Sequence, residues 1–573
     1  MNNHDNNTFF FFNTNVKEVL IMFETTQESR YDLLDFVKKA EGKFLTSHCE
    51  ISKSPTATGL GIIATQDIGE GTKIISIPKS AIFSASNSNI ANLLQDEEID
   101  GMFALNIAFI YEISTFKDTS HWYPYLKHIP LKNTETDEPI LPVSFWTEKQ
   151  KRLLKGTTAD VFHKILEPQE EVMEGFELAI ELAQKWSDEF GLSIPEYYLS
   201  LNDPNDKDEF DTKFKRFCSL AFALSSRVLE IDQFHESGLV PIVDLINHHC
   251  KNVNAEFLSL FDVCDKCGES GTCRHLLAEE AEEAIEMAKL DQNHLKVDAN
   301  GATINDIISM ETIIELEKDH NEPFSDEEDD KQGMSKPEEE LNNPDDYVDI
   351  VTTRGILKGE EIFISYGPLP NAFLLAKCGF TMADNPFDIV YAGNSLTKML
   401  NEKQYSKCEE RIRWWIQAGR DLFLKWYKEL EEQIGSDEES EEESAEEEEQ
   451  EIDDNDDNEE KWLEDLCWDR KSKLTPAFKA LVTLMSMNEH TWQAYFQHIR
   501  EERDLNKSLR SLAPKVMNTA AKKIIRALAA SRLSELPLKT GAEEESLVDP
   551  LTLRYLETLR QGEVKILRHK SLE

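Results

Sequence analysis

Apolar side chains recur at helical spacing in the first half of the chain. Residues 31–39 combine charged and apolar side chains in the pattern of an amphipathic helix. The same spacing recurs over 102–111 and 173–190, where apolar residues return every three or four positions. We therefore expect helices at these places and a largely helical segment over 101–230.

Short β-rich segments flank that helical stretch. Residues 60–64 follow two glycines and contain β-branched side chains, and 73–78 form a second strand-like run that ends at proline. Short strands are expected again over 231–383, where 361–366 leads from a Gly-Glu turn to a Tyr-Gly pair. Short strands combined with helical regions predict an α+β fold.

The last third of the chain again carries helix signals. Thr475 followed by Pro476 has the form of an N-cap and a first helical residue. Residues 520–533 are rich in strong helix formers. These signals predict a helical C-terminal domain.

The chain has 573 residues, which favours two or three folded units with linkers rather than one core. We expect a disordered leader, within which 1–21 are an extension, then a first domain with two insertions, then a helical domain interrupted by an acidic run. The predicted boundaries are 1–26 for the leader, 27–383 for the first domain, about 101–230 for its helical insertion, about 262–346 for its polar and acidic insertion, 384–573 for the helical domain, and 436–460 for the acidic run.

Charge and composition narrow the class of protein. The net charge is −49, and 436–460 contains 17 acidic residues and no basic one. This balance argues against direct nucleic-acid binding and favours a basic protein partner, although the run could serve solubility alone. No apolar run reaches the roughly 18 residues that a membrane span needs. Nine cysteines over this length favour a reducing compartment, either cytoplasm or nucleus.

Three motifs carry candidate chemistry. Gly59, Leu60 and Gly61 form a Gly-rich turn before a strand, a buried apolar run ends in Asn247-His248, and a strand ends at Tyr366. Each motif alone is more often structural: a β-turn, a satisfied polar turn, or a core aromatic.

Taken in order, and followed by Asn371 and Gly379-Phe380, these motifs resemble the SET-domain protein lysine methyltransferases. The helical insertion and tail make the chain similar to the Rubisco-methyltransferase-like class. The resemblance implies small β-sheets with a knot-like crossing and a helical insertion, followed by an all-α substrate-binding domain.

The resemblance also implies a role for each matching residue. Asp244 and Cys378 would lie on the substrate side. The cofactor-binding residues implied for S-adenosyl-L-methionine (AdoMet) are Gly59, Leu60, Gly61, Arg227, Asn247, His248 and Tyr366. Tyr366 is also the implied catalytic residue. The match departs from the family at Leu229, where Phe is common, and at Cys378, where Tyr is common. The second departure bears on the number of methyl groups added.

The function expected from the resemblance is methylation of a lysine side chain in a protein. The chain resembles the fungal ribosomal-protein lysine methyltransferases, which favours a large-subunit ribosomal protein as the basic substrate of a monomeric enzyme. The alternatives are another non-histone protein, such as cytochrome c or an elongation factor, and a non-catalytic adaptor for basic proteins.

The sequence leaves open whether one further cluster of side chains binds a metal ion. Cys264, Cys267, Cys273 and His275 lie within twelve residues and could hold one zinc ion. The interval between the two pairs is shorter than in most zinc fingers, and a polar loop with free thiols is the alternative. We therefore assign no metal ligand from the sequence.

Overall fold

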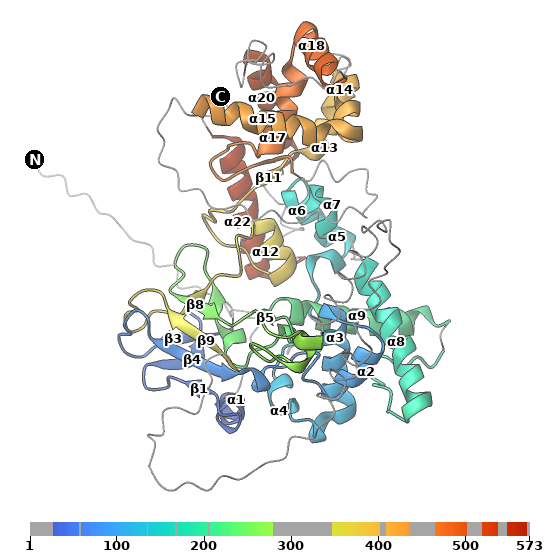
Figure 1. The fold of residues 1–573 in the computed structure, drawn as a ribbon, viewed down its shortest axis with the longest axis vertical. Coiled ribbons are helices and arrows are strands. Elements are labelled where there is room, and N and C mark those ends of the chain that lie inside the picture. The colour runs from blue at the N-terminus through green and yellow to red at the C-terminus, as the bar shows by residue number, and fades with distance from the viewer. Residues whose placement is uncertain are drawn as a thin grey trace, which may run out of the picture.

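The computed structural model describes most of the chain between residues 27 and 569 (Figure 1). The described ranges are 27–56, 59–133, 136–166, 170–203, 205–278, 346–401, 408–435, 465–500, 518–536 and 547–569. The predicted leader at 1–26, the acidic run at 436–460 and most of the insertion at 262–346 lie outside the described residues.

The first part of the chain forms small sheets, as the α+β prediction requires. Strands β1, β4, β9 and β8 form a four-stranded antiparallel sheet in that order. Two hairpins, β2–β3 and β5–β6, and one parallel pair, β7–β10, complete the strands of this part. The strand bounds are β1 (Lys43–Phe44), β2 (Cys49–Lys53), β3 (Leu60–Ala64), β4 (Lys73–Pro78), β5 (Leu229–Asp232), β6 (Glu236–Gly238), β7 (Asn247–His248), β8 (Ala255–Leu258), β9 (Tyr347–Thr352) and β10 (Phe363–Ile364).

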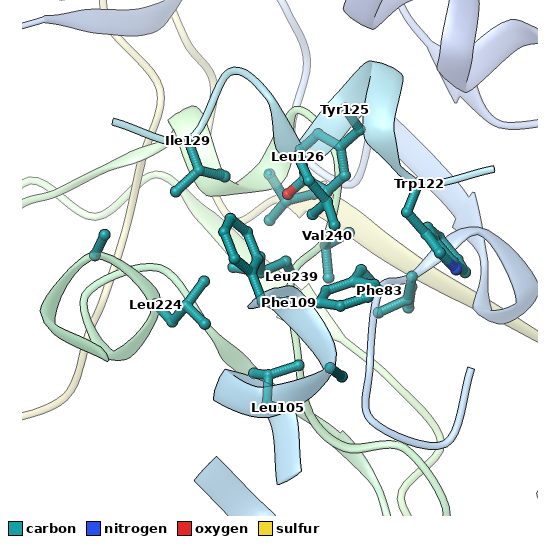
Figure 2. Close-up of a cluster of buried hydrophobic side chains, with 14 of the residues drawn as sticks. Phe83, Leu105, Phe109, Trp122, Tyr125, Leu126, Ile129, Leu224, Leu239 and Val240 are labelled. Atoms are coloured by element: carbon teal, nitrogen blue, oxygen red, sulfur yellow. The ribbon is translucent and has the colours of Figure 1, made fainter. Parts of the chain in front are cut away.

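Helices of the insertion pack beside these sheets. The helices of this part are α1 (Gln27–Lys39), α2 (Ala91–Asp96), α3 (Gly101–Tyr111), α4 (Tyr123–Leu126), α5 (Glu148–Lys151), α6 (Thr158–Val161), α7 (His163–Leu166), α8 (Glu170–Phe190), α9 (Lys207–Ser225) and α12 (Asn371–Cys378). Helix α3 is buried along its whole length after the first turn, because it is apolar on every face. Figure 2 shows Leu105 and Phe109 of this helix among Phe83, Leu224 and Leu239. The helix thus joins the insertion to the strands in one core.

The C-terminal part is mainly helical and has its own core. Its helices are α13 (Gly393–Leu400), α14 (Glu409–Trp414), α15 (Arg420–Gly435), α17 (Pro476–Ser486), α18 (Glu489–Arg500), α20 (Thr519–Glu535) and α22 (Pro550–Leu567). Buried aromatic residues such as Trp415 and Trp492 pack at its centre. The prediction of an all-α domain needs one correction, because β11 (Val390–Tyr391) pairs with β12 (Cys467–Trp468). Pairs of two residues are too short to leave a period in the sequence.

Helix α22 returns from the C-terminal part to the first part (Figure 1). Its Leu556 and Leu559 share a buried cluster with Ala372 and Leu375 of α12. The Thr381 hydroxyl donates to the Tyr555 carbonyl at 2.9 Å. The end of the chain therefore supports the helix that follows the predicted Tyr-Gly motif.

The expected helices at 31–39, 102–111, 173–190 and 520–533 are confirmed by α1, α3, α8 and α20. Helix α17 begins at Pro476 as predicted, but the side chain of Thr475 does not cap it. That hydroxyl instead donates to the Asp465 carbonyl and accepts from the Cys467 amide, closing the loop at β12.

Among the described residues, no helix has both the length and the apolar character to cross a membrane.

A buried carboxyl group links α22 to the rest of the molecule and makes stability depend on pH. Glu563 accepts from the Thr158 amide at 2.7 Å and lies 3.7 Å from Arg532. Burial raises the pKa of the Glu563 carboxyl to about 7, although Arg532 acts in the opposite direction. The folded state therefore holds a proton that the unfolded state releases near pH 4.5, and stability falls as pH rises from there through 7.

We expect Glu563→Gln to flatten this pH dependence by up to about 1.4 kcal/mol per pH unit. Denaturant unfolding of wild type and variant between pH 5 and 8 measures the difference. Glu557→Gln, at an exposed position on the same helix, should keep the wild-type slope. Parallel curves for wild type and Glu563→Gln would show that the pKa of this carboxyl is not raised in the folded protein.

Candidate active site

Two segments far apart in the sequence meet at the parallel pair β7–β10. Asn247 pairs with Phe363, and His248 with Ile364. Buried Asn254 fixes the junction, since its Oδ1 accepts from the Phe363 amide at 2.8 Å and its Nδ2 donates to the Glu361 carbonyl at 2.9 Å. The second and third predicted motifs therefore form one structure.

The side chain of Glu361 connects all three motifs. Its Oε1 accepts from Asn247 Nδ2 at 2.7 Å. Its Oε2 accepts from the hydroxyls of Ser54 and Thr56 at 2.8 and 2.7 Å. Asn247 Nδ2 also donates to the Leu60 carbonyl at 3.0 Å. The Glu361 carboxyl group, only 4% exposed, thus links the segment before the Gly-rich turn to the β7–β10 pair.

The two glycines of the first motif are required for different reasons. Gly59 has φ of +102°, a conformation that side chains rarely adopt. At Gly61 a Cβ atom would lie 2.3 Å from Glu361 Oε1 and 3.0 Å from Asn247 Nδ2. The space that a side chain at position 61 would need is therefore taken by Glu361 and Asn247.

Tyr366 lies two residues after β10, so the strand predicted at 361–366 is shorter than expected. Its hydroxyl donates to the Ile246 carbonyl at 2.7 Å, and its amide donates to His248 Nδ1 at 3.0 Å. Burial raises the pKa of the Tyr366 phenol well above its usual value. Burial also lowers the pKa of His248 to about 4. Both side chains are therefore neutral at pH 7.

The ionisable side chains of Asp244 and Arg227 lie near Tyr366. Burial raises the pKa of Asp244 to about 6, although Arg227 lowers it. Tyr125 of α4 donates to Asp244 Oδ2 at 3.0 Å. Arg227 donates to the Ala223 carbonyl at 3.0 Å, and burial lowers its pKa while Asp244 raises it. Tyr125 thus connects the helical insertion directly to the site.

Cys378, the position where the family pattern commonly has Tyr, also lies near Tyr366. Cys378 ends α12, and burial raises the pKa of its thiol to about 11. Cys378 is close enough to Tyr366 and Arg227 to affect their pKa values. The other departure, Leu229, is half-buried at the start of β5.

A cleft of about 820 Å³ opens between the insertion helices and α12. Ser225 and Lys377 line it, and these residues adjoin Ser226-Arg227 and Cys378 in the chain. Its walls are mostly apolar and include the aromatic side chains of Phe103, Phe145, Phe217, Phe222 and Phe373. Asp100 and Glu171 add acidic side chains. The cleft can accept an extended segment with apolar and basic side chains.

The structure brings together every site residue predicted from the sequence, in two adjoining groups. Leu60, Gly61 and Asn247 lie around Glu361, while Arg227, Asp244, His248 and Cys378 surround Tyr366. Gly59 precedes Leu60 in the chain, and its carbonyl accepts from the Ser54 amide at 3.0 Å. The residues missed are Ser54, Thr56, Tyr125, Asn254 and Glu361. Glu361 had a signal, because it is a carboxylate just before a buried strand in a recognised motif. The other four lie in unremarkable sequence and are found only through their contacts.

Comparison with known proteins gives a full-length match. A scan against protein-family models finds none that matches. The chain is 41% identical over 563 residues to ribosomal lysine N-methyltransferase 3 of Saccharomyces cerevisiae, covering 95% of this chain and 99% of that protein. It is 27% identical over 363 residues to ribosomal lysine N-methyltransferase 4 of Schizosaccharomyces pombe, and this match covers 62% of this chain and 67% of that protein. A solved structure of the SET domain of LSMT with lysine and AdoHcy aligns at a TM-score of 0.47 and 14% identity, covering 95% of this chain and 90% of that one.

Proposed function

Because this chain belongs to the ribosomal lysine N-methyltransferase family, we propose that it transfers a methyl group from AdoMet to the side-chain amine of a lysine in a ribosomal protein. The observation that carries the proposal is the match to ribosomal lysine N-methyltransferase 3, combined with the partly buried Tyr366 hydroxyl at the place where the second and third motifs meet. A non-catalytic adaptor would have no need to preserve that buried polar arrangement.

The residues present fit a polar, partly charged cofactor. In the described part of the chain, His248 Nε2 and Asp244 Oδ1 are buried polar atoms without a hydrogen-bond partner. Such atoms are costly unless a bound group satisfies them. The Arg227 guanidinium would suit the carboxylate of AdoMet, and the Asn247-His248 segment its adenine end. AdoMet supplies, when bound, a methyl group on a positively charged sulfur.

The chain's own residues would align and desolvate the reacting amine. A lysine amine has an unperturbed pKa of about 10.4 and must be neutral to act as a nucleophile. A buried site lowers that pKa by desolvation, and a nearby positive charge lowers it further. The Tyr366 hydroxyl donates to Ile246, so its oxygen lone pairs remain available to orient a methyl group through weak C–H···O contacts. Alignment of this kind is the main contribution expected from the protein.

The substrate side is proposed from charge and shape. Ribosomal proteins are basic, which suits a chain with a net charge of −49 and a cleft that contains Asp100 and Glu171. We place the residues that flank the target lysine in that cleft and assign the C-terminal helices to substrate docking. The knot-like crossing expected for the fold would correspond to the β7–β10 junction. We further propose a monomer that acts in the cytoplasm or nucleus, without direct contact to nucleic acid or membrane.

The test is incubation of the purified chain with labelled AdoMet and a ribosomal-protein extract from cells that lack the enzyme. We expect label in a large-subunit protein, located by mass spectrometry at one or a few lysines. Label on cytochrome c or an elongation factor, and none on ribosomal proteins, would replace the proposed substrate. A protein that binds AdoMet but labels nothing in any cell extract would favour the adaptor.

A further inference from the structure

Four side chains outside the active site converge at the beginning of the polar insertion. The Sγ atoms of Cys264, Cys267 and Cys273 and a ring nitrogen of His275 all lie within 4.8 Å of one another. Cys264 Sγ and His275 Nδ1 are 3.7 Å apart. Within the described parts of the chain, this is the one group of three or more such residues placed to share a metal ion.

These distances suit a tetrahedral metal ion. Zinc binds thiolate sulfur at about 2.3 Å and imidazole nitrogen at about 2.0 Å, which places neighbouring ligand atoms about 3.5–3.8 Å apart. The distance from Cys264 to His275 already falls in that range, and the largest separation exceeds it by about 1 Å. Small rotations of exposed Cys267 and half-buried His275 would close the difference.

The backbone around the first pair is shaped for a bound metal. The amides of Cys267 and Gly268 donate to the Cys264 carbonyl at 3.4 and 2.8 Å, forming a tight turn. Gly268 has φ of +72°, which lets the chain reverse just after the second cysteine. This turn brings the side chains of Cys264 and Cys267 close enough to share one ion.

The cluster rests on a fixed part of the fold. Just before it, the Leu260 carbonyl accepts from Lys79 Nζ at 2.7 Å, and the Phe261 carbonyl accepts from the Gln233 amide at 3.3 Å. Lys79 is itself buried in an ion pair with Asp232 of β5, at 2.7 Å. A Cβ at Gly268 would lie 2.9 Å from the Phe234 ring, so the turn packs tightly on the β5–β6 hairpin. This support holds the four ligands in a defined place.

The alternative is a polar loop with unrelated free thiols. All nine cysteines lie in the described ranges and carry free thiols, but only these three lie together. Cys264 and Cys273 are buried, at 1% and 5% exposure, within a segment rich in charged and glycine residues. An apolar core does not explain why three sulfurs and an imidazole should face one another there.

We propose that Cys264, Cys267, Cys273 and His275 bind one zinc ion. Three thiolates and one imidazole complete a closed four-coordinate site, which is the form of structural rather than catalytic zinc. The ion would tie residues 264–275 into a compact unit on the β5–β6 hairpin, at the point where the insertion leaves the sheet. Its role is to fix the start of the insertion.

The first measurement is the metal content of the full chain, purified without chelator and under reducing conditions. We expect about one zinc per chain, and at least a tenfold lower content in Cys264→Ser with Cys267→Ser. Cys250→Ser removes a half-buried thiol outside the cluster and should retain the zinc. His275→Cys replaces the imidazole with a fourth thiolate and should also retain it, whereas His275→Ala should weaken retention.

Cobalt substitution gives a readout that does not depend on the variants folding. Wild-type protein freed of zinc should take up about one Co²⁺ and develop thiolate-to-cobalt bands with tetrahedral d–d absorption. Folded wild-type protein with neither zinc nor a cobalt spectrum would overturn the proposal. So would zinc that persists in the double variant, or iron in place of zinc. No methyl transfer enters these measurements, so they succeed or fail independently of the proposed enzymatic function.

Discussion

Replacing Tyr366 with Phe should reduce kcat by about 10²–10³-fold, or roughly 2.7–4 kcal/mol, which is the scale for removing one preorganised polar group from a transition state. The ring would remain, so its packing against His248 at a centroid distance of 5.2 Å is preserved. The hydroxyl is lost together with its bond to the Ile246 carbonyl. AdoMet affinity should change less than turnover, because the hydroxyl matters most while the methyl group is being transferred.

Single-turnover methyl incorporation, AdoMet affinity and thermal unfolding separate these effects. Removal of this partly buried hydroxyl leaves the Ile246 carbonyl without its donor, which costs at most about 1–3 kcal/mol of stability. Tyr197→Phe deletes a hydroxyl at a partly exposed position in the insertion and should leave turnover unchanged. Near-normal kcat in a folded Tyr366→Phe enzyme would remove this tyrosine from the catalytic role.

The motifs located Tyr366 and Asn247 because each is a polar side chain at the end of a buried apolar run, and they located Gly61 because it stands in a Gly-rich turn before a strand. Each motif alone was more often structural, but the order of the three along the chain indicated the family. The α+β class followed from the change between short β-branched runs and helical spacing. Family membership, shown by the full-length match, agrees with the resemblance that these motifs indicated.

The contacts among the motifs could not be predicted in the same way. Glu361 accepts hydrogen bonds from Ser54 and Thr56, about 300 residues earlier in the chain, and no local pattern records such a pairing. Tyr125 lies in an apolar helix and looks like a core residue, yet its hydroxyl reaches Asp244. Short strands such as β7 and β10 are defined by tertiary pairing, not by propensity.

The position of α22 shows a similar limit. An amphipathic pattern along a helix does not identify the surface that the helix covers. The structure places Leu556 and Leu559 against α12, next to the residues that follow Tyr366. Boundaries drawn from composition at 383 and 384 therefore separate segments that share a buried cluster.

Asn247→Ala should weaken AdoMet binding by about 1–3 kcal/mol, or roughly 5- to 160-fold in Kd. The amide of Asn247 donates to both Glu361 Oε1 and the Leu60 carbonyl. Its removal leaves a buried carboxyl oxygen and a carbonyl without that donor. The Gly-rich turn and the crossing then lose the direct bond that joins them, so the proposed cofactor site loses its preorganised shape.

Calorimetry with AdoMet on the folded variant measures the change, and Asn252→Ala, at an exposed position five residues later, should keep the wild-type affinity. Glu361→Gln supplies the second arm of a double-mutant cycle. If Asn247 acts through Glu361, the two losses should sum to more than the loss in the double variant, because either change alone breaks the same junction. Additive losses would mean that Asn247 supports the cofactor independently of Glu361, and unchanged affinity in Asn247→Ala would remove it from the binding site.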